Sequence, residues 1–387
     1  MKVAFFSNYL NHHQLPFCLA MNRKTNGQFT FVATTPIPNF RVKLGYRDMN
    51  REYPFVLTTY DNKENAKRAM QIAVESDAII IGSAPECYIR ERIKHKKLTF
   101  EYSERIYKSG IPRGINIVKS LGSVIKHHTC YIHLPVYMLC ASCYTARDFA
   151  LSGAYIGKTY KWGYFPETHE YNIEDLLSIK GEGKTKSLLW VGRLIDWKHP
   201  DDAIKIAKEL KDEGYEFQLN IIGQGPLMSS LQQQIHDLKL QDCVHMMGSM
   251  SPELVRKEME KSNIYLFTSD FHEGWGAVLN ESMNSACAVV ASHAIGSAGF
   301  LIQDGKNGLI YKNGDMYDLH QKVKYLLDNT AGMNNIAKNA YLTIENTWNA
   351  EIAAERLIKL SESLLSTGKR NLYADGPCSK AKIFRKR

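Results

Sequence analysis

The stretch IYLFTSDFHEGWGAVLNESM, residues 264–283, decides the fold. It opens with an apolar run, residues 264–269, which predicts a buried β-strand. A loop with Gly274 and Gly276 follows, and a helix is predicted to open around Ala277. A strand, a glycine-containing loop and a helix in this order are typical of a parallel α/β sheet. Such sheets bind their ligands at the carboxyl ends of the strands.

The same alternation of strand and helix runs through the whole chain in two series. The predicted strands of the first series are residues 2–7, 29–35, 77–83, 97–102 and 136–142, and those of the second are 186–193, 217–223, 244–248, 264–269 and 287–292. The clearest predicted helices are residues 64–76, 115–128, 201–214 and 226–240. Apolar runs without a period of two indicate strands that are covered on both faces. The predicted fold class is therefore α/β, with two Rossmann-like parallel-sheet domains.

A stretch with glycine, proline and no periodicity, residues 161–172, separates the two series. We therefore predict an N-terminal domain over residues 1–165 and a C-terminal domain over residues 166–350. Residues 351–387 are expected to form a C-terminal helix and a basic tail. A chain of 387 residues is long enough for two domains of ordinary size.

The composition is that of an ordinary globular protein, with 44% hydrophobic and 23% charged residues. No apolar run reaches the roughly 18–20 residues that span a bilayer. The first apolar run is too short for a secretory signal and reads as a strand. Eight scattered cysteines indicate a reducing compartment, and Cys140 and Cys143 have no second C-x-x-C to complete a zinc site. We expect a cytoplasmic protein, peripheral on the inner face of the membrane if it binds lipid.

Basic residues gather in two places, within a net charge of +9. Residues 369–387 hold seven basic residues and one acid, and residues 90–97 read RERIKHKK. Such patches serve nucleic acid or anionic lipid, and the alternative is solvated surface. No nucleic-acid motif accompanies either patch, so an anionic membrane surface is the expected partner and nucleic acid is not.

Two cations follow the first strand of the second series. That strand ends at Val191 and Gly192, and Arg193 and Lys198 lie on the next loop, before a helix that starts near Pro200. A guanidinium, an ammonium and a helix N-terminus at the carboxyl end of a parallel strand suit a diphosphate. Alone, the pattern is also that of a surface loop with two cations.

Glycines and carboxylates complete the candidate site. Gly223 and Gly225 lie between a strand and a helix, where a tight turn is the simpler interpretation. Glu273 precedes the helix that opens near Ala277, and Glu281 lies eight residues further on. A carboxylate accepts two hydroxyl hydrogen bonds at once, which suits the diols of a sugar or a ribose. The alternative is a glycine-rich helix start with two solvated glutamates.

The order V-G-R-L…K, then G-x-G, then E-G-W-G-x-x-x-x-E-S-M resembles glycosyltransferase family 4. Residues 295–311 also match that family's glycine-rich loop and following strand, and the likeness is strong over about residues 186–320. The resemblance implies the GT-B fold, two Rossmann-like domains facing each other across a cleft, and a retaining transferase of the bacterial surface-polysaccharide type.

The resemblance also implies a role for individual residues. Arg193 and Lys198 would bind the donor diphosphate and stabilise the leaving group, Glu273 would contact the donor sugar, and Glu281 would hold the ribose hydroxyls. The remaining implied donor-binding residues are Gly192, Gly223, Gly225, Gly274, Trp275 and Gly276. The sequence has no D-x-D motif, so no metal and no cofactor besides the nucleotide-sugar co-substrate are expected.

The first half departs from the family pattern. The loop after the first strand, SNYLNHHQLP, has no glycine. Asn11, His12 and His13 are expected to line an acceptor site, and the alternative is that His12 and His13 merely cap a helix. The family's first-domain histidine is missing, which leaves Glu101 as an acceptor-binding candidate and Glu104 as a catalytic one, or else both in a charged loop. Phe300 stands where relatives often have an acidic residue, which would change contacts to the donor sugar.

The predicted function is transfer of a sugar from a nucleoside-diphosphate sugar to a glycan or polyprenyl-linked acceptor in polysaccharide biosynthesis. Breaking a glycosyl–phosphate bond builds negative charge on the diphosphate, and preorganised cations stabilise that charge. The alternatives on the same architecture are a non-hydrolysing sugar-nucleotide epimerase, a phosphorylase, or a sugar-nucleotide-binding protein without catalysis.

Overall fold

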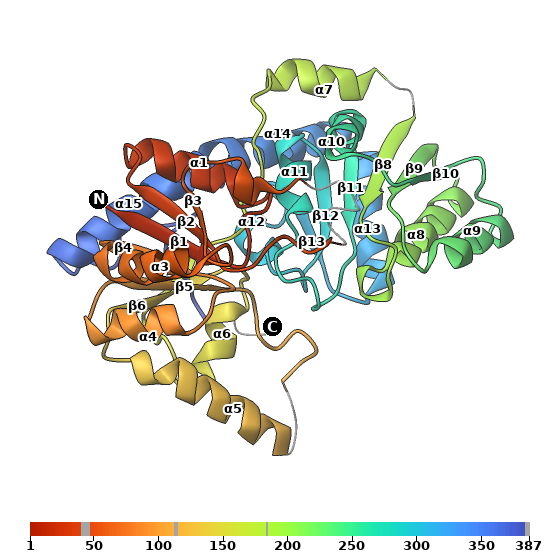
Figure 1. Ribbon diagram of the computed structural model, residues 1–387. Coiled ribbons are helices and arrows are strands. Elements are labelled where there is room, and N and C mark those ends of the chain that lie inside the picture. Colours follow the sequence, from red (N-terminus) through yellow and green to blue (C-terminus); the bar gives the residue numbers. More distant parts are fainter. Residues whose placement is uncertain (40–46, 112–114, 183–184, 384–387) are drawn as a thin grey trace. The chain divides into compact units, whose positions relative to one another are not determined.

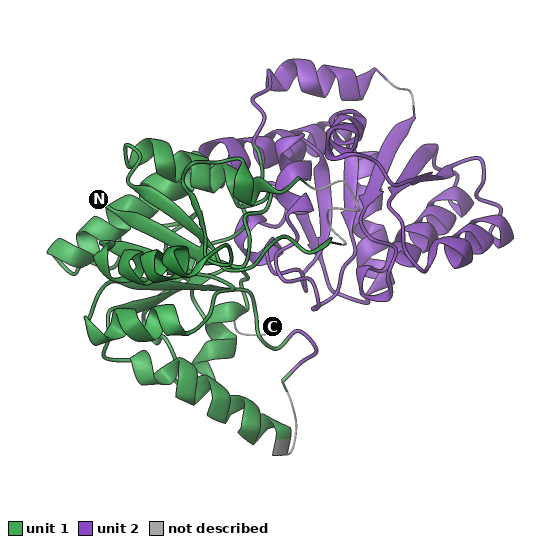
Figure 2. Ribbon diagram, viewed as in Figure 1, with its two compact units in different colours: residues 1–107, 111–167, 349–387 green, residues 108–110, 168–348 purple. Residues whose placement is uncertain are grey.

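The structure is a computed structural model that describes residues 1–39, 47–111, 115–182 and 185–383. It divides into two compact units, shown in different colours in Figure 2. Unit 1 comprises residues 1–107, 111–167 and 349–387, and unit 2 comprises residues 108–110 and 168–348. The chain passes from unit 1 to unit 2 inside the aperiodic stretch 161–172, and returns to unit 1 after Trp348.

Unit 1 is built on a seven-stranded sheet whose described pairings between strands are all parallel. In spatial order the strands are β3 (Val56–Thr58), β2 (Phe29–Ala33), β1 (Val3–Ser7), β4 (Ala78–Ile81), β5 (Thr99–Ser103), β6 (Val136–Cys140) and β7 (Thr159–Lys161). The helices are α1 (Leu15–Lys24), α3 (Lys63–Glu75), α4 (Cys87–Lys94), α5 (Ile115–His127), α6 (Thr145–Ala150) and α15 (Ala350–Ser366), with short 3-10 turns η1 (Met49–Arg51) and η2 (Thr129–Tyr131). The five predicted strands of this half are confirmed to within one or two residues at most ends.

The central strands of unit 1 are buried along their whole length. β1, β4 and β6 have no exposed position, as expected for strands that are covered on both faces. Strands β3 and β7, at the two edges of the sheet, were not predicted, because each has only three residues. Runs this short give no apolar pattern long enough to recognise.

The C-terminal segment belongs to unit 1. Helix α15 packs along α1 (Figure 1). Beyond it, the chain lies antiparallel along the outer edge of β7: the amide of Cys378 donates to the carbonyl of Lys161 at 2.9 Å, and the amide of Ala381 donates to that of Thr159 at 3.1 Å. The Nζ of Lys380 donates to the carbonyl of Gly157 at 2.8 Å. The expected basic tail is therefore a packed part of the sheet edge as far as residue 383.

Unit 2 is built on a six-stranded parallel sheet. Its strands, in spatial order, are β10 (Val244–Gly248), β9 (Phe217–Ile222), β8 (Lys186–Val191), β11 (Ile264–Phe267), β12 (Ala288–Ser292) and β13 (Leu309–Tyr311). Its helices are α7 (Ile173–Gly181), α8 (Pro200–Asp212), α9 (Met228–Asp237), α10 (Pro252–Lys261), α11 (Val278–Asn284), α12 (Ala298–Leu301), α13 (Met316–Asp328) and α14 (Thr330–Asn346), with a 3-10 turn η3 (Asp196–Lys198). The five predicted strands of the second series and the predicted helices 201–214 and 226–240 are confirmed, the helices with shorter ends. The fold class, two Rossmann-like parallel-sheet units, is confirmed.

The order of strands in unit 2 reverses direction between β8 and β11. The chain runs outward from β8 through β9 to β10, and then returns to β11 on the other side of β8. The connections from β8 and from β11 therefore lead to opposite sides of this pair of strands: β8 is followed by β9 on one side, and β11 by β12 on the other. In open α/β sheets, such a reversal of strand order is where ligands bind.

Candidate functional site

The residues predicted to bind a donor come together at this reversal point of unit 2. The Nζ of Lys198, on the loop after β8, donates to Oε2 of Glu273, on the loop after β11, at 2.6 Å. The hydroxyl of Ser269 donates to the same oxygen at 3.1 Å. The side chains of Lys198 and Glu273 are only 12% and 13% exposed, so water screens the pair weakly. Both residues were predicted to bind the donor, but their contact with each other was not predicted.

The indole ring of Trp197 lies close to both predicted diphosphate-binding cations. The Nζ of Lys198 is 4.8 Å from the centroid of the Trp197 ring, and the guanidinium carbon of Arg193 is 5.9 Å from it. A cation over an indole face is attracted by the ring's quadrupole. The Lys198 ammonium is paired with Glu273, whereas the exposed Arg193 remains accessible to an anionic ligand.

The predicted glycines of the loop after β9 have a packing role. A Cβ atom on Gly223 would lie 1.8 Å from the carbonyl oxygen of Gly192, and one on Gly225 would lie 2.3 Å from that of Leu194. Only glycine lets the two loops approach this closely. Gly223 and Gly225 thus fix the backbone that carries Arg193, which is a structural reason for the G-x-G spacing beside the predicted nucleotide contact.

Contacts with the core of unit 2 determine the conformation of the segment Glu273–Ala277. Gly276 has φ +82°, and a Cβ there would lie 2.5 Å from the Phe267 ring. Trp275, predicted to bind donor, is fully buried: its Nε1 donates to Oδ1 of Asn280 at 2.9 Å, and its ring packs near those of Phe300 and Trp348. Trp275 therefore anchors the loop from the core, and its side chain is not available to a ligand.

Phe300 and Glu281 also lie deeper than the sequence suggests. Phe300 is 8% exposed and stacks on Trp348, so its side chain is chiefly a core residue rather than a contact for a sugar. Burial raises the pKa of the Glu281 carboxyl, and the charge of Arg256 partly opposes that shift. A carboxyl in such a place gains from the hydroxyl donors of a ligand, which replace the water that it has lost.

A second cluster lies at the carboxyl edge of the sheet of unit 1. The hydroxyl of Tyr164 donates to Oε1 of Glu104 at 2.7 Å, and the Tyr164 ring is stacked at 5.9 Å and 5° on the imidazole of His13. Tyr164 was missed because it lies in the aperiodic stretch after β7, which sequence analysis treated only as a junction. Glu104 and His13, two of the predicted residues, are thus neighbours through a tyrosine.

Hydrogen bonds in the loop after β1 show how the start of α1 is held. Oδ1 of Asn11 accepts from the amides of His13 and Gln14 at 3.1 and 3.2 Å, just before α1. Asn11 therefore holds the turn that leads into α1, whose N-cap residue, Gln14, makes no side-chain capping hydrogen bond. The rings of His12 and His13 lie 3.7 Å apart, centroid to centroid.

Glu101 is placed differently from its prediction as an acceptor ligand. Its Oε2 lies 2.9 Å from Nδ1 of His128, which also lies 2.9 Å from the hydroxyl of Tyr155. Burial raises the pKa of the Glu101 carboxyl, and its contact with His128 opposes the shift. Because neighbouring side chains of a strand point to opposite faces, Glu101 and Tyr102 lie on different sides of the sheet. Tyr102, not Glu101, is in contact with Tyr164.

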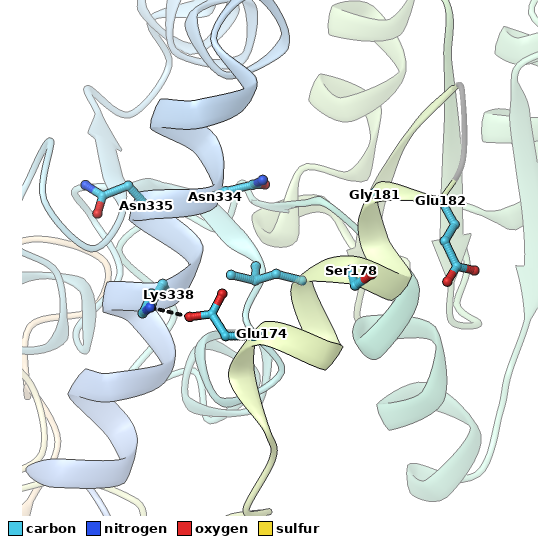
Figure 3. A pocket seen from close by; sticks show the side chains of 8 residues that line it. Glu174, Ser178, Gly181, Glu182, Asn334, Asn335 and Lys338 are labelled. Atoms are coloured by element: carbon cyan, nitrogen blue, oxygen red, sulfur yellow. Dashed lines mark hydrogen bonds and ion pairs between the residues drawn. The ribbon is translucent and has the colours of Figure 1, made fainter.

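A pocket of about 620 Å³ lies elsewhere in unit 2, between α7 and α14 (Figure 3). Glu174 and Lys338 face each other across it and form an ion pair. Its other lining residues are Leu177, Ser178, Gly181, Glu182, Asn334 and Asn335. None of them belongs to the predicted site.

Known proteins resemble this chain most clearly in unit 2. Residues 173–343 match the family model described as "Glycosyl transferases group 1", which is less than half of the chain. The amylovoran biosynthesis glycosyltransferase AmsK of Erwinia amylovora is 28% identical over 209 residues, 53% of this chain and 50% of AmsK. The N-acetylgalactosamine-N,N'-diacetylbacillosaminyl-diphospho-undecaprenol 4-alpha-N-acetylgalactosaminyltransferase of Campylobacter jejuni is 31% identical over 164 residues, 41% of this chain and 43% of that protein.

The likeness in fold extends further than the likeness in sequence. The crystal structure of Anabaena Alr3699/HepE in complex with UDP matches with a TM-score of 0.68 and 18% identity, over 95% of this chain and 100% of that one. The fold is therefore the GT-B fold, and the matched segment and the named relatives are those of glycosyltransferases. The chain spans half or less of the length of the two curated relatives named above. Within the described residues, no helix is both long and apolar enough to cross a membrane.

Proposed function

We propose that this protein transfers a sugar from a nucleoside-diphosphate sugar to a glycan or polyprenyl-linked acceptor, with retention of configuration, as a member of glycosyltransferase family 4. The observation that carries the proposal is the pair Lys198–Glu273 at the reversal point of the sheet, with Arg193 beside it. The relatives named above support a polysaccharide or lipid-linked acceptor, since AmsK takes part in amylovoran biosynthesis and the Campylobacter enzyme acts on an undecaprenol diphosphate.

Different residues of unit 2 bind the diphosphate, the sugar and the ribose of the donor. The diphosphate takes the guanidinium of Arg193 and the ammonium of Lys198, which stabilise the charge that builds as the glycosyl–phosphate bond breaks. As Lys198 turns to the phosphate, the Glu273 carboxylate becomes free to accept hydrogen bonds from sugar hydroxyls. The half-buried Glu281 takes the ribose hydroxyls. The two cations supply the stabilisation of charge, so we propose a reaction without a metal or a further cofactor.

The acceptor side of the proposal rests on unit 1. Glu104 is held by the Tyr164 hydroxyl at 2.7 Å, and a carboxylate so oriented suits an acceptor hydroxyl as hydrogen-bond partner or base. His13, stacked on Tyr164, belongs to the same cluster. Retention follows if the acceptor attacks from the face that the leaving diphosphate occupies, so that no enzyme nucleophile is needed.

A screen of nucleotide sugars tests the donor. We expect one of the UDP-, GDP- or ADP-sugars to raise the melting temperature, since a ligand at 100 times its Kd stabilises the folded state by about 2.7 kcal/mol. The matching nucleoside monophosphate, which lacks the second phosphate, is the control and should give a smaller shift. If none of the three classes shifts the melting temperature, donor binding is contradicted. Turnover without acceptor would instead favour an epimerase, and binding without turnover would favour a sensor.

We also propose that the acceptor is reached at an anionic membrane surface on the cytoplasmic side, through helix α5. Val118 and Ile125 are 67% and 51% exposed on this helix, seven residues apart and hence on one stripe. Lys119 and Lys126 form the neighbouring stripe, and residues 115–127 contain no acidic residue. An apolar stripe flanked by lysines is typical of a helix that lies in the lipid interface. In the basic run of α4, by contrast, Arg90 pairs with Glu86 and Lys94 with Glu91.

Flotation with phosphatidylglycerol vesicles tests the role of α5. We expect binding at low salt and release at high salt, since each basic residue near an anionic surface contributes about 1 kcal/mol. Ile125→Asp should lower the partition coefficient about 10-fold, because the variant lacks an apolar side chain that the lipid interface would bury. Leu254→Asp, at a site that is 51% exposed on α10, is the matched control. Absence of binding even at low salt would contradict a membrane surface as partner.

A further inference from the structure

We propose that Thr268, together with Trp190, is a positioning residue that sets the place of the Lys198 ammonium; this rests on the proposed role of Lys198 in donor binding. Thr268 directly follows β11, and Trp190 lies in β8. Their exposed fractions are 1% and 2%, so neither side chain is available to a ligand. Any effect that they have on the reaction must pass through the loop that they hold.

The Thr268 hydroxyl connects three segments of the chain. It accepts from Nε1 of Trp190 at 2.9 Å, and it lies 2.7 Å from the carbonyl oxygen of Lys198 and 2.8 Å from that of His199. A hydroxyl has a single hydrogen. The indole N–H of Trp190 donates to the Thr268 oxygen. The hydrogen of the Thr268 hydroxyl is therefore left to the carbonyl oxygens of Lys198 and His199, between which it is shared. The hydroxyl thereby fixes the turn on which the Lys198 side chain stands.

That turn needs holding because of its conformation. His199 has φ +48° and ψ +54°, the left-handed region that residues other than glycine seldom adopt. The carbonyl of Lys198 belongs to the peptide that enters His199, and the carbonyl of His199 belongs to the peptide that leaves it, so the Thr268 hydroxyl contacts the backbone on both sides of this residue. A further hydrogen bond holds the same turn: the amide of Asp270, which follows β11, donates to the carbonyl of Trp197 at 2.9 Å. The loop after β8 is thus bonded to the end of β11 at three successive residues.

The conformation of this turn sets the position of the Lys198 ammonium. The Lys198 Nζ lies 2.6 Å from Glu273, 4.8 Å from the Trp197 ring centroid and 5.9 Å from that of Phe267. A change in the direction of the Lys198 carbonyl rotates the whole residue, which carries Nζ out of this position. Misplacement of a reacting group by about 1 Å can lower a rate about 100-fold.

Thr268→Val tests the proposal, because valine keeps the size and branching of threonine and lacks the hydroxyl. Two properties are measured: the ¹³C NMR signal of reductively methylated Lys198, identified by its loss in Lys198→Arg, and the turnover of the nucleotide sugar found in the screen. We expect the Lys198 signal of Thr268→Val to move toward that of exposed lysines and kcat to fall 10- to 100-fold. Thr268→Ser, which restores the hydroxyl, should return both properties to nearly wild-type values.

Ser262→Ala is the matched control. Ser262 is 1% exposed in unit 2, and its hydroxyl donates to the carbonyl of Glu258 at 2.7 Å, so this variant loses a buried hydroxyl outside the loop after β8. If Thr268→Val does not fold, Trp190→Phe carries the same test, since it removes the indole N–H and keeps a ring.

The outcomes separate this inference from the proposed function. An unchanged Lys198 signal in Thr268→Val, or an equal change in Ser262→Ala, overturns the positioning role. A Lys198 signal that moves and is restored by serine supports it even if the wild-type protein turns over no nucleotide sugar. In that case the proposed function fails and the positioning role stands.

Discussion

Lys198→Ala is expected to lower turnover by about 100-fold or more, and Glu273→Ala by a similar factor, since groups aimed at charge developing in a transition state have effects of this size. Removal of Lys198 has two consequences. The diphosphate loses a cation, and the Glu273 carboxylate, only 13% exposed, loses the partner that neutralises it. Steady-state kinetics with the donor identified by melting temperature measures the effect.

Lys205→Ala is the control for this prediction. Lys205 is a 45% exposed lysine on α8 that pairs with Asp201 at 2.6 Å, so the variant removes the same charge from the same unit without touching the site. Exposed pairs of this kind contribute little to stability. A rate close to wild type in Lys198→Ala, or an equal loss in Lys205→Ala, would refute the role of Lys198 in the reaction.

Gly223→Ala is expected to have the largest effect on stability, a loss of about 3 kcal/mol or more, because overpacking against rigid backbone is strongly destabilising. The added methyl group would lie 1.8 Å from the carbonyl oxygen of Gly192, which belongs to the backbone and cannot rotate away. Relief requires the loops after β8 and β9 to separate, which also displaces Arg193. Denaturant unfolding followed by circular dichroism measures the loss.

Two other glycines separate the causes of that loss. Gly214 has φ +84° and open space around its Cβ position, so Gly214→Ala measures conformational strain alone, about 1 kcal/mol. Gly181 has open space and no left-handed φ, so Gly181→Ala should be nearly neutral. If Gly223→Ala costs no more than Gly214→Ala, the close approach of the two loops is not rigid, and the packing role of the G-x-G spacing is wrong.

The fold could be predicted from the sequence because most of its strands appear as apolar runs, and β1, β4 and β6 are buried along their whole length. The strands that were missed, β3 and β7, have three residues each and carry no such run. The C-terminal segment could not be placed either. Nothing in its basic composition shows that its backbone pairs with the edge of β7, since those hydrogen bonds use amides and carbonyls rather than side chains.

The candidate site could be predicted only as separate motifs. The contact between Lys198 and Glu273 depends on β8 lying next to β11, a neighbourhood set by the order of strands and not by distance along the chain. For Trp275 and Phe300 the motif was recognised, but burial could not be inferred, because an aromatic residue in a ligand loop can point either way. Thr268 and Tyr164 gave no signal, because each acts through one hydroxyl whose partners are distant in sequence.

The discontinuity of unit 1 has a consequence for synthesis on the ribosome. Apart from residues 108–110, unit 2 is one unbroken stretch, residues 168–348, whereas unit 1 needs residues 349–383 to cover α1 and to line the edge of β7. Domains fold as units while the chain emerges. The second unit to be translated therefore has its full set of residues first. The amino-terminal sheet is completed only when residues 349–383, which hold α15 and the segment that pairs with β7, have left the exit tunnel.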